Sequence, residues 1–178
     1  AASDVYKRQC IGCALGVNLP KARVIFADIS SEALSVTRKN ISLHRLNSRA
    51  VALEADALAP PPLRMQNFDL IACNPPYITE AECKALDTSV RDWEPMLALD
   101  GGEDGLVFYR SVLQNWKSVL KDGGWIIFEV GEGQAADVRA LLLEAGFHNL
   151  GCTLDTLGTE RVIYAQKKKP IPTDSEEM

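Results

Sequence analysis

The stretch FDLIACNPPY, residues 68–77, decides the fold of this chain. Its first six residues form a short, mostly apolar run, which predicts a buried strand. The two prolines cannot donate to a β-ladder, so we expect the chain to leave the sheet at Asn74 in a stiff turn. The Asn74 carboxamide offers one acceptor and two donors, and Tyr77 offers a flat ring. The stretch therefore favours a site for an amide or amino-purine group, with a plain turn as the alternative.

Strands and helices alternate on both sides of this stretch. Before it, strands are predicted over 23–27 and 50–54, with an apolar helix over 11–19 and a helix that Ser30 caps and that runs to about residue 46. After it, we expect helices near 80–88, over 105–120 and over 134–145, a strand over 125–130 that follows the break at Gly123-Gly124, and a hairpin of strands over 148–155 and 161–166.

This alternation predicts an α/β fold with a doubly wound, mostly parallel sheet and a C-terminal antiparallel hairpin. Such sheets bind ligands beyond the carboxyl ends of their strands, where Asp28, Asp56 and Asn74 are expected. A carboxylate at Asp28 can bind the ribose hydroxyls of an adenosine cofactor, although a turn or helix-capping aspartate is an equally good interpretation. The three residues together fit an S-adenosylmethionine site better than a dinucleotide site.

Composition limits the classes of function. The chain has 178 residues, a length that suits one domain. Its net charge of -5 and pI of about 5.1 argue against a broad nucleic-acid footprint, and no apolar run is long enough for a membrane span. The five scattered cysteines favour reduced thiols in the cytoplasm. The Cys10–Cys13 pair has no second pair or nearby histidine, so we expect no metal site.

Four segments carry a resemblance to a known family. They are Asp28-Ile29-Ser30-x-Glu32-Ala33-Leu34, Asn74-Pro75-Pro76-Tyr77-Ile78, Val90-Arg91-Asp92-Trp93-Glu94-Pro95 and Ala98-Leu99-Asp100-Gly101-Gly102-x-Asp104-Gly105. With them, residues 10–166 resemble the HemK/PrmC family of protein N5-glutamine methyltransferases, which modify peptide chain release factors. The last two segments are the specific ones, because adenine-N6 methyltransferases of DNA and RNA share the four-residue motif.

The resemblance implies a class I, Rossmann-like S-adenosylmethionine-dependent methyltransferase. The methyl group would pass to the side-chain N5 of the glutamine in the Gly-Gly-Gln loop of class 1 release factors. Catalytic and substrate-binding roles would fall to Asn74, Pro75, Pro76 and Tyr77. Cofactor contacts would come from Asp28, Ile29, Asp56, Ala57 and Asn74, with S-adenosyl-L-methionine as the cofactor and no metal.

The amino-terminal residues depart from the family pattern. The family's glycine-rich loop would fall at positions 3–9, where this chain has no glycine. We expect residues 1–9 to be a non-native leader, residues 10–166 to be the catalytic domain and residues 167–178 to be a disordered tail. The first strand and the glycine loop would then be missing or replaced, so the strands over 23–27 and 68–73 would face each other across a gap.

Other functions remain open at this point. One alternative is adenine-N6 methylation of DNA or RNA, which the acidic charge disfavours. A second is methylation of a ribosomal-protein glutamine, and a third is a non-catalytic remnant that only binds a partner. The expected enzyme is a cytoplasmic monomer without a membrane or nucleic-acid partner.

Overall fold

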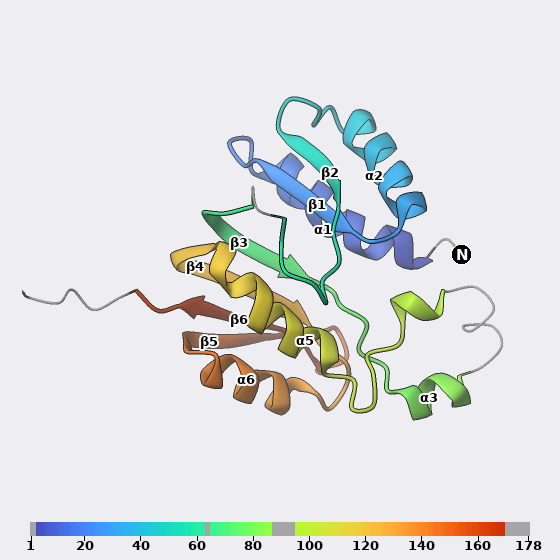
Figure 1. The fold of residues 1–178 in the computed structure, drawn as a ribbon, viewed down its shortest axis with the longest axis vertical. Coiled ribbons are helices and arrows are strands. Elements are labelled where there is room, and N and C mark those ends of the chain that lie inside the picture. The colour runs from blue at the N-terminus through green and yellow to red at the C-terminus, as the bar shows by residue number, and fades with distance from the viewer. Residues whose placement is uncertain (1–2, 63–64, 87–94, 170–178) are drawn as a thin grey trace, which may run out of the picture.

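The computed structural model describes residues 3–62, 65–86 and 95–169. Its strands form a two-stranded sheet with the order β1-β2 and a four-stranded sheet with the order β3-β4-β6-β5. Figure 1 shows the two sheets next to each other, with helices around them. The chain completes the smaller sheet before it begins the larger one, so each sheet has its own helices.

The smaller part of the molecule contains two helices and two strands. In chain order they are α1 (Ser3–Asn18), β1 (Val24–Asp28), α2 (Ser31–Leu43) and β2 (Ala50–Glu54). The strands pair in parallel, with Val24 opposite Ala50 and Asp28 opposite Glu54. Parallel neighbours need a crossover connection, which α2 supplies. The predicted strands are therefore confirmed, with β1 displaced by one residue.

The α2 helix has the predicted start and an earlier end. Ser30 caps it, because the Ser30 side chain accepts a hydrogen bond from the Ala33 amide. The helix ends at Leu43 because Arg45 adopts a left-handed backbone conformation with φ of 57°. Leu46 is nevertheless only 1% exposed, so the residues after the helix still contribute to the core.

The α1 helix begins earlier than predicted, at Ser3. The sequence between Ser3 and Ile11 contains neither proline nor glycine, so nothing in it breaks the helix. Further along, Gly12 lies against β1, and a Cβ atom there would stand only 2.2 Å from the Phe26 ring. The absence of a side chain at Gly12 thus lets α1 approach the sheet closely.

The larger part of the molecule contains the remaining strands. They are β3 (Phe68–Cys73), β4 (Leu120–Glu129), β5 (Phe147–Leu154) and β6 (Glu160–Lys167). The β3 strand has the predicted limits and pairs with β4 in parallel, whereas β6 is antiparallel to both β4 and β5. The predicted α/β class with a C-terminal antiparallel hairpin is confirmed.

Lys167 was assigned to the tail by sequence, but it is the last residue of β6. Its ammonium group donates a hydrogen bond of 2.7 Å to the Leu120 carbonyl and pairs with Asp122 at 3.3 Å. These two contacts keep Lys167 in the sheet. Lys168 and Lys169 follow the strand as exposed residues, and residues 170–178 of the predicted tail lie outside the described residues.

The start of β4 also differs from the prediction. The strand begins at Leu120 and contains Gly123 and Gly124, which were expected to precede it. Its register with β3 shifts after the Phe68–Leu120 pair, and Gly123 has a positive φ of 79°. A bulge of this kind accommodates extra residues, and glycine adopts its backbone conformation without strain.

The helices of the larger part are short. They are α3 (Glu80–Ala85), η1 (Met96–Ala98), α5 (Val107–Ser111), the π-helical turn η2 (Val112–Trp116), the 3₁₀ turn η3 (Lys117–Val119) and α6 (Ala135–Glu144). The single helix predicted over 105–120 is thus divided into three segments. Trp116 anchors the π-helical turn, because its indole N–H donates to the Ala59 carbonyl at 3.0 Å. π-helical turns are rare and occur mostly as single turns within longer helices, as here between α5 and η3.

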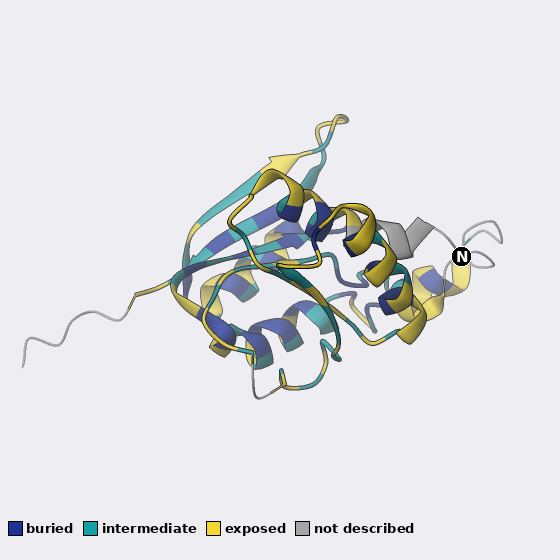
Figure 2. Ribbon diagram, turned by 90° about the horizontal axis from the view of Figure 1, so that it is seen from above, coloured by how far each residue is buried: buried dark blue, intermediate teal, exposed yellow. Residues whose placement is uncertain are grey.

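Two hydrophobic clusters stabilise the two parts unequally. The larger cluster lies between the four-stranded sheet and its helices, and its fully buried members are Tyr109, Ile126, Phe128, Val130, Val138, Leu142, Ile163 and Ala165. The smaller cluster consists of Cys13, Phe26, Ile41 and Leu46. Figure 2 shows the buried residues concentrated on the inward faces of the helices. No helix in the described part of the chain is both long and apolar enough to cross a membrane.

Candidate functional site

A cleft of about 750 Å³ lies between β1 and β3. Residues along both strands line it, and α1 borders it through Ile11 and Leu15. Within the described residues no strand lies between β1 and β3, so each strand has one edge toward the cleft. The cleft reaches the carboxyl ends of both strands, which is where sheets of this class bind ligands.

Asn74 lies at the end of β3 and lines this cleft. The preceding residue, Cys73, pairs with Phe128 of β4, so the strand is held up to its last residue. Pro75 and Pro76 are buried and also line the cleft. Within the described residues the Asn74 side chain makes no hydrogen bond, so its donors and its acceptor remain available to a ligand.

Asp28 lies across the cleft from Asn74, at the end of β1. One of its carboxylate oxygens accepts a hydrogen bond of 2.9 Å from the Ser30 amide, which is the turn role considered as an alternative. The carboxylate still lies at the cleft, so the turn orients it without removing it from the site. Ile29 is 45% exposed and does not line the cleft.

The segment after β2 brings Ala57 to the same cleft. The Ala55 amide donates to the Asp28 carbonyl at 3.0 Å, and the Ala57 carbonyl accepts from the Ser111 hydroxyl at 2.9 Å. These contacts hold the segment between β1 and α5. Asp56 accepts a hydrogen bond of 2.8 Å from the Leu58 amide and does not line the cleft. The structure therefore brings together Asp28, Ala57 and the Asn74 turn, and leaves Asp56 and Ile29 beside them.

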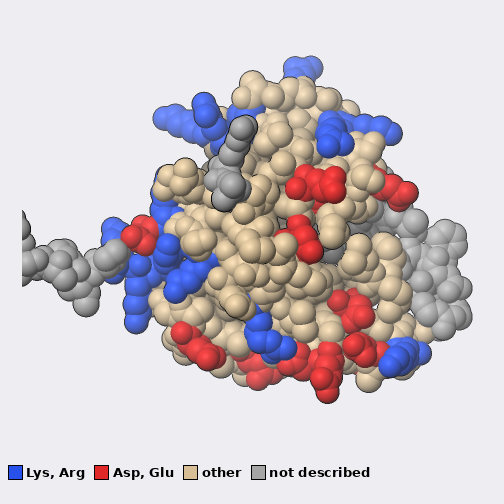
Figure 3. All heavy atoms as spheres, in the orientation of Figure 1, with Lys and Arg blue, Asp and Glu red and all other residues tan. Residues whose placement is uncertain are grey.

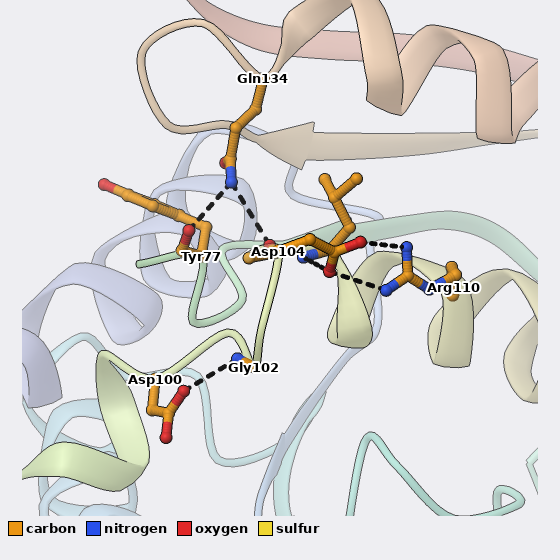
Figure 4. A network of polar contacts seen from close by, with 8 residues as sticks. Tyr77, Asp100, Gly102, Asp104, Arg110 and Gln134 are labelled. Carbon is orange, nitrogen blue, oxygen red and sulfur yellow. Dashed lines mark hydrogen bonds and ion pairs between the residues drawn. The ribbon is translucent and has the colours of Figure 1, made fainter. Parts of the chain in front are cut away.

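Tyr77 ends the Asn74 turn, and a glutamine holds its backbone. The Gln134 side-chain amide donates to the Tyr77 carbonyl at 2.9 Å and to the Gly105 carbonyl at 3.4 Å (Figure 4). Its oxygen accepts a hydrogen bond from the Gly131 amide at 3.0 Å. The Tyr77 ring packs against the larger hydrophobic cluster and does not line the cleft. By sequence Gln134 is only the start of a helix, although the preceding Gly131-x-Gly133 marks a tight turn at a strand end.

The glycine-rich loop after η1 packs directly on the Asn74 turn. A Cβ atom at Gly101 would lie 2.8 Å from the Tyr77 Cα, and the Ile78 amide donates to the Leu99 carbonyl at 3.0 Å. Two aspartates order this loop, since Asp100 accepts from the Gly102 amide and Asp104 accepts from Arg110 (Figure 4). The segment 98–105 thus supports the turn. Residues 90–94 of the neighbouring segment lie outside the described residues.

Electrostatic effects near the turn are local. The side-chain hydrogen bonds from Arg110 lower the pKa of the Asp104 carboxyl. Burial raises the pKa of the Tyr109 hydroxyl, which donates a hydrogen bond of 2.9 Å to the Glu129 carbonyl at the end of β4. This hydroxyl stays protonated and structural. The five cysteines form no disulfide, and the described part of the chain has no group of three or more side chains arranged to bind a metal.

The residues present fit an adenosine-type cofactor with a transferable group. A carboxylate at one strand end suits a ribose, and an unpartnered carboxamide at the opposite strand end suits the acceptor of the group. The neighbouring Ala57 offers a small apolar wall. No paired acid and base and no nucleophile with an adjacent base lies among these residues, so the arrangement favours chemistry by positioning.

Known proteins with similar sequences are named as methyltransferases. The curated release factor glutamine methyltransferase of Clostridium botulinum is 40% identical over 170 residues, which are 91% of this chain and 60% of that protein. The one of Geobacter sulfurreducens is 39% identical over 154 residues, covering 86% of this chain and 53% of that protein. The chain thus spans little more than half the length of these relatives.

The fold is also found in solved structures. The crystal structure of a methyltransferase from Pyrococcus furiosus superposes with a TM-score of 0.63 at 15% identity, over 90% of this chain and 70% of that one. At this identity the match establishes the methyltransferase fold alone. The model of the methyltransferase small domain matches residues 9–127, from α1 through most of β4 and including the Asn74 turn. This match covers more than half of the chain, which therefore belongs to the methyltransferase small domain family.

Proposed function

We propose that this protein transfers a methyl group from S-adenosyl-L-methionine to the side-chain N5 of the glutamine in the Gly-Gly-Gln loop of class 1 peptide chain release factors. The observation that carries the proposal is the Asn74 carboxamide, held at the end of β3 on a cleft that Asp28 also lines. The names of the relatives support the choice of a release factor glutamine as the acceptor.

Asp28, Asp56 and Ala57 are proposed to bind the cofactor. The Asp28 carboxylate accepts hydrogen bonds from the ribose hydroxyls. Ala57 borders the adenine ring, and the Asp56 carboxylate accepts a hydrogen bond from the adenine amino group. Ile29 packs beside the adenosine from the turn after β1. S-adenosyl-L-methionine would supply a methyl group on a positively charged sulfur, so no metal is needed to activate the group that is transferred. As the N–CH3 bond forms the S–CH3 bond breaks, S-adenosylhomocysteine leaves, and the amide nitrogen releases one proton to water.

Asn74 and Pro75 are proposed to hold the substrate amide. An amide nitrogen is a poor nucleophile because its lone pair is delocalised into the carbonyl. The Asn74 side-chain oxygen and the Pro75 carbonyl each accept a hydrogen bond from the substrate NH2, which fixes the nitrogen toward the methyl group and favours a pyramidal geometry. Pro76 borders the same cleft, whereas the Tyr77 ring would have to turn from the larger cluster toward the cleft to pack against the substrate amide. Positioning of this kind lowers a barrier by several kcal/mol.

Charge favours a protein substrate over nucleic acid. In Figure 3 the lysine and arginine side chains lie in separate groups, and acidic side chains lie between them near the centre of the face. A continuous basic stripe would be expected along a nucleic-acid track. We therefore propose a release factor and not a nucleic acid as the substrate. We also propose that the enzyme acts in the cytoplasm as a monomer.

A chimaera tests the proposal. Residues 10–166 replace the matching segment of the Clostridium botulinum relative. That relative then supplies the segment in front of residue 10, where the family has its glycine-rich loop, and the domain is assayed at the full length of that protein. The chimaera receives S-adenosylmethionine and either a release factor, the same factor with the loop glutamine changed to alanine, or a mixed RNA pool. We expect mass spectrometry to find one added methyl group on the loop glutamine of the first substrate only. Cofactor binding without transfer to that glutamine, or methylated adenine in the RNA, would refute the proposal.

A further inference from the structure

We propose that Gln134 is a positioning residue that sets the orientation of Asn74 by fixing the far end of the Asn74–Tyr77 turn. The inference rests on the proposed function, in which Asn74 holds the substrate amide. Gln134 itself does not line the cleft, so it would act through the turn and not through contact with the substrate.

One side chain connects three separate backbone segments. The Gln134 amide nitrogen donates to the carbonyls of Tyr77 and Gly105, at 2.9 and 3.4 Å, and its oxygen accepts from the Gly131 amide at 3.0 Å. Tyr77 is 57 residues away along the sequence and Gly105 is 29 residues away. In Figure 4 the Gln134 side chain points toward Tyr77, and dashed lines mark the hydrogen bonds that its nitrogen donates. Only a side-chain amide offers two donors and an acceptor in this arrangement.

Two glycines leave the space that this contact requires. A Cβ atom at Gly105 would lie 2.4 Å from the Tyr77 carbonyl oxygen and 2.5 Å from the Gln134 nitrogen. A Cβ atom at Gly131 would lie 2.7 Å from the Gln134 oxygen and 3.0 Å from the Tyr77 ring. Any side chain at either position would push the glutamine away from the turn. The close packing on both sides therefore restricts the amide to one place.

The turn can transmit this restraint to Asn74 because it is stiff and held at both ends. At its start, Cys73 is paired with Phe128 in the β3–β4 ladder. At its end, Gln134 holds the Tyr77 carbonyl, and only Pro75 and Pro76 separate Tyr77 from Asn74. Proline restricts φ to a narrow range and leaves only ψ free to rotate, so few backbone torsions between Tyr77 and Asn74 can absorb a movement at Tyr77. Loss of the contact at Tyr77 should therefore turn the Asn74 carboxamide.

Hydrogen exchange on the full chain tests the structural half of the inference. The variants are Gln134→Met, which keeps the length but removes every polar atom, and Gln134→Glu, which keeps the acceptor for Gly131 and loses both donors at neutral pH. Gln166→Met is the matched control. Gln166 also makes two side-chain hydrogen bonds, donating to the Gly123 carbonyl at 2.8 Å and accepting from Asn149 at 2.9 Å. It lies opposite Trp125 of β4, away from the Asn74 turn.

We expect the Ile78 and Gly101 amides to exchange about fivefold or more faster in both Gln134 variants and to keep their rates in Gln166→Met. In the intact protein these amides donate to the Leu99 and Ile78 carbonyls. If Gln134→Met fails to fold, Gln134→Glu decides the result, because its side chain has nearly the same shape. Unchanged exchange at Ile78 and Gly101 in a folded Gln134 variant would overturn the inference.

Kinetics of the chimaera test the functional half. We expect both Gln134 variants to lower kcat about a hundredfold, with the KM for release factor and the Kd for cofactor changed less than about threefold. At lower pH a protonated glutamic acid regains one donor, so kcat of Gln134→Glu should recover relative to that of Gln134→Met. Equal kcat in variant and parent, or an equal loss in Gln166→Met, would overturn the positioning role.

The two proposals fail in different ways. A chimaera that methylates no release factor refutes the proposed function and with it the effect on catalysis, while hydrogen exchange still decides whether Gln134 holds the turn. A chimaera that is active but insensitive to Gln134 refutes only the positioning role.

Discussion

The strands β4 and β1 each form one parallel ladder, with β3 and with β2, yet their apolar residues are buried to different extents. Ile126 and Phe128 of β4 are 0% exposed, whereas Ile25 of β1 is 36% exposed. The difference lies in their neighbours, because β4 is paired along both edges and β1 has β2 on one edge and the cleft on the other. Apolar composition thus indicates a strand, and the neighbours of that strand determine how much of it is protected from water.

The candidate site takes residues from both sheets. Asn74 extends from the four-stranded sheet, which rests on the larger cluster, while Asp28 extends from the two-stranded sheet and its smaller cluster. Local stability follows the density of buried apolar contacts. The residue proposed to hold the substrate is therefore supported by the more rigid part, and the residue proposed to bind the ribose by the less rigid one.

The largest expected effect is on the free energy of unfolding, when one phenylalanine in each hydrophobic cluster is replaced by alanine. Phe128→Ala should lower the free energy of unfolding by about 3–5 kcal/mol, because the ring is fully buried and packs edge-on against Tyr109 with centroids 5.2 Å apart. Phe26→Ala should cost about half as much, since its smaller cluster has fewer atoms around the cavity that is left.

Urea unfolding followed by circular dichroism measures both losses, and the exposed Leu143→Ala serves as a control that should change little. Equal losses at Phe128 and Phe26 would show that the two parts are equally well packed. The comparison on which the other predictions depend would then be wrong.

The next largest effect concerns the substrate side of the site. In the chimaera, Asn74→Ala should raise the barrier to methyl transfer by about 2.7–4 kcal/mol, by analogy with the loss of one donor in an oxyanion hole. Cofactor affinity should stay near that of the parent, because Asn74 is proposed to bind mainly the substrate amide. Asn47→Ala, which removes an exposed carboxamide in the turn after α2, is the control. Near-normal turnover of Asn74→Ala would exclude Asn74 from this role.

A smaller effect is expected on the cofactor side. Asp28→Ala should weaken binding of S-adenosylhomocysteine by about 1.5–3 kcal/mol, the usual value of hydrogen bonds to a charged group, with turnover at saturation largely kept. Asp28→Asn separates the charge from the turn, because an asparagine oxygen can still accept the hydrogen bond from Ser30. Calorimetric titration of the chimaera checks both variants. Unchanged affinity in each would remove Asp28 from the site.

The features that sequence predicted well are those set by neighbouring residues. The strand over 68–73 ends at its predicted residue because the Asn74-Pro75-Pro76 sequence stops it, and α2 starts where Ser30 can cap it. The π-helical turn and the Gln134 contact were missed, since they depend on Ala59 and Tyr77, each 57 residues away from its partner. The binding roles of the site residues stay predictions until the variants above are measured.

The smallest expected change in stability is that of Ile25→Lys, which should also reduce self-association. The cleft leaves edges of β1 and β3 available to other chains, and exposed strand edges favour intermolecular pairing. Ile25 lines the cleft, and a lysine there would place a charge beside the open edge of β1, a substitution that natural edge strands use. We expect Ile25→Lys to change the free energy of unfolding by less than about 0.5 kcal/mol and to reduce concentration-dependent association in sedimentation velocity. Leu157→Lys makes the same change of charge at a residue that is 90% exposed in the β5–β6 turn, so it controls for net charge alone. Of the two substituted residues, Ile25 borders the cleft and Leu157 does not. If both variants reduce association equally, charge repulsion between whole molecules explains the effect, and pairing at the β1 edge does not.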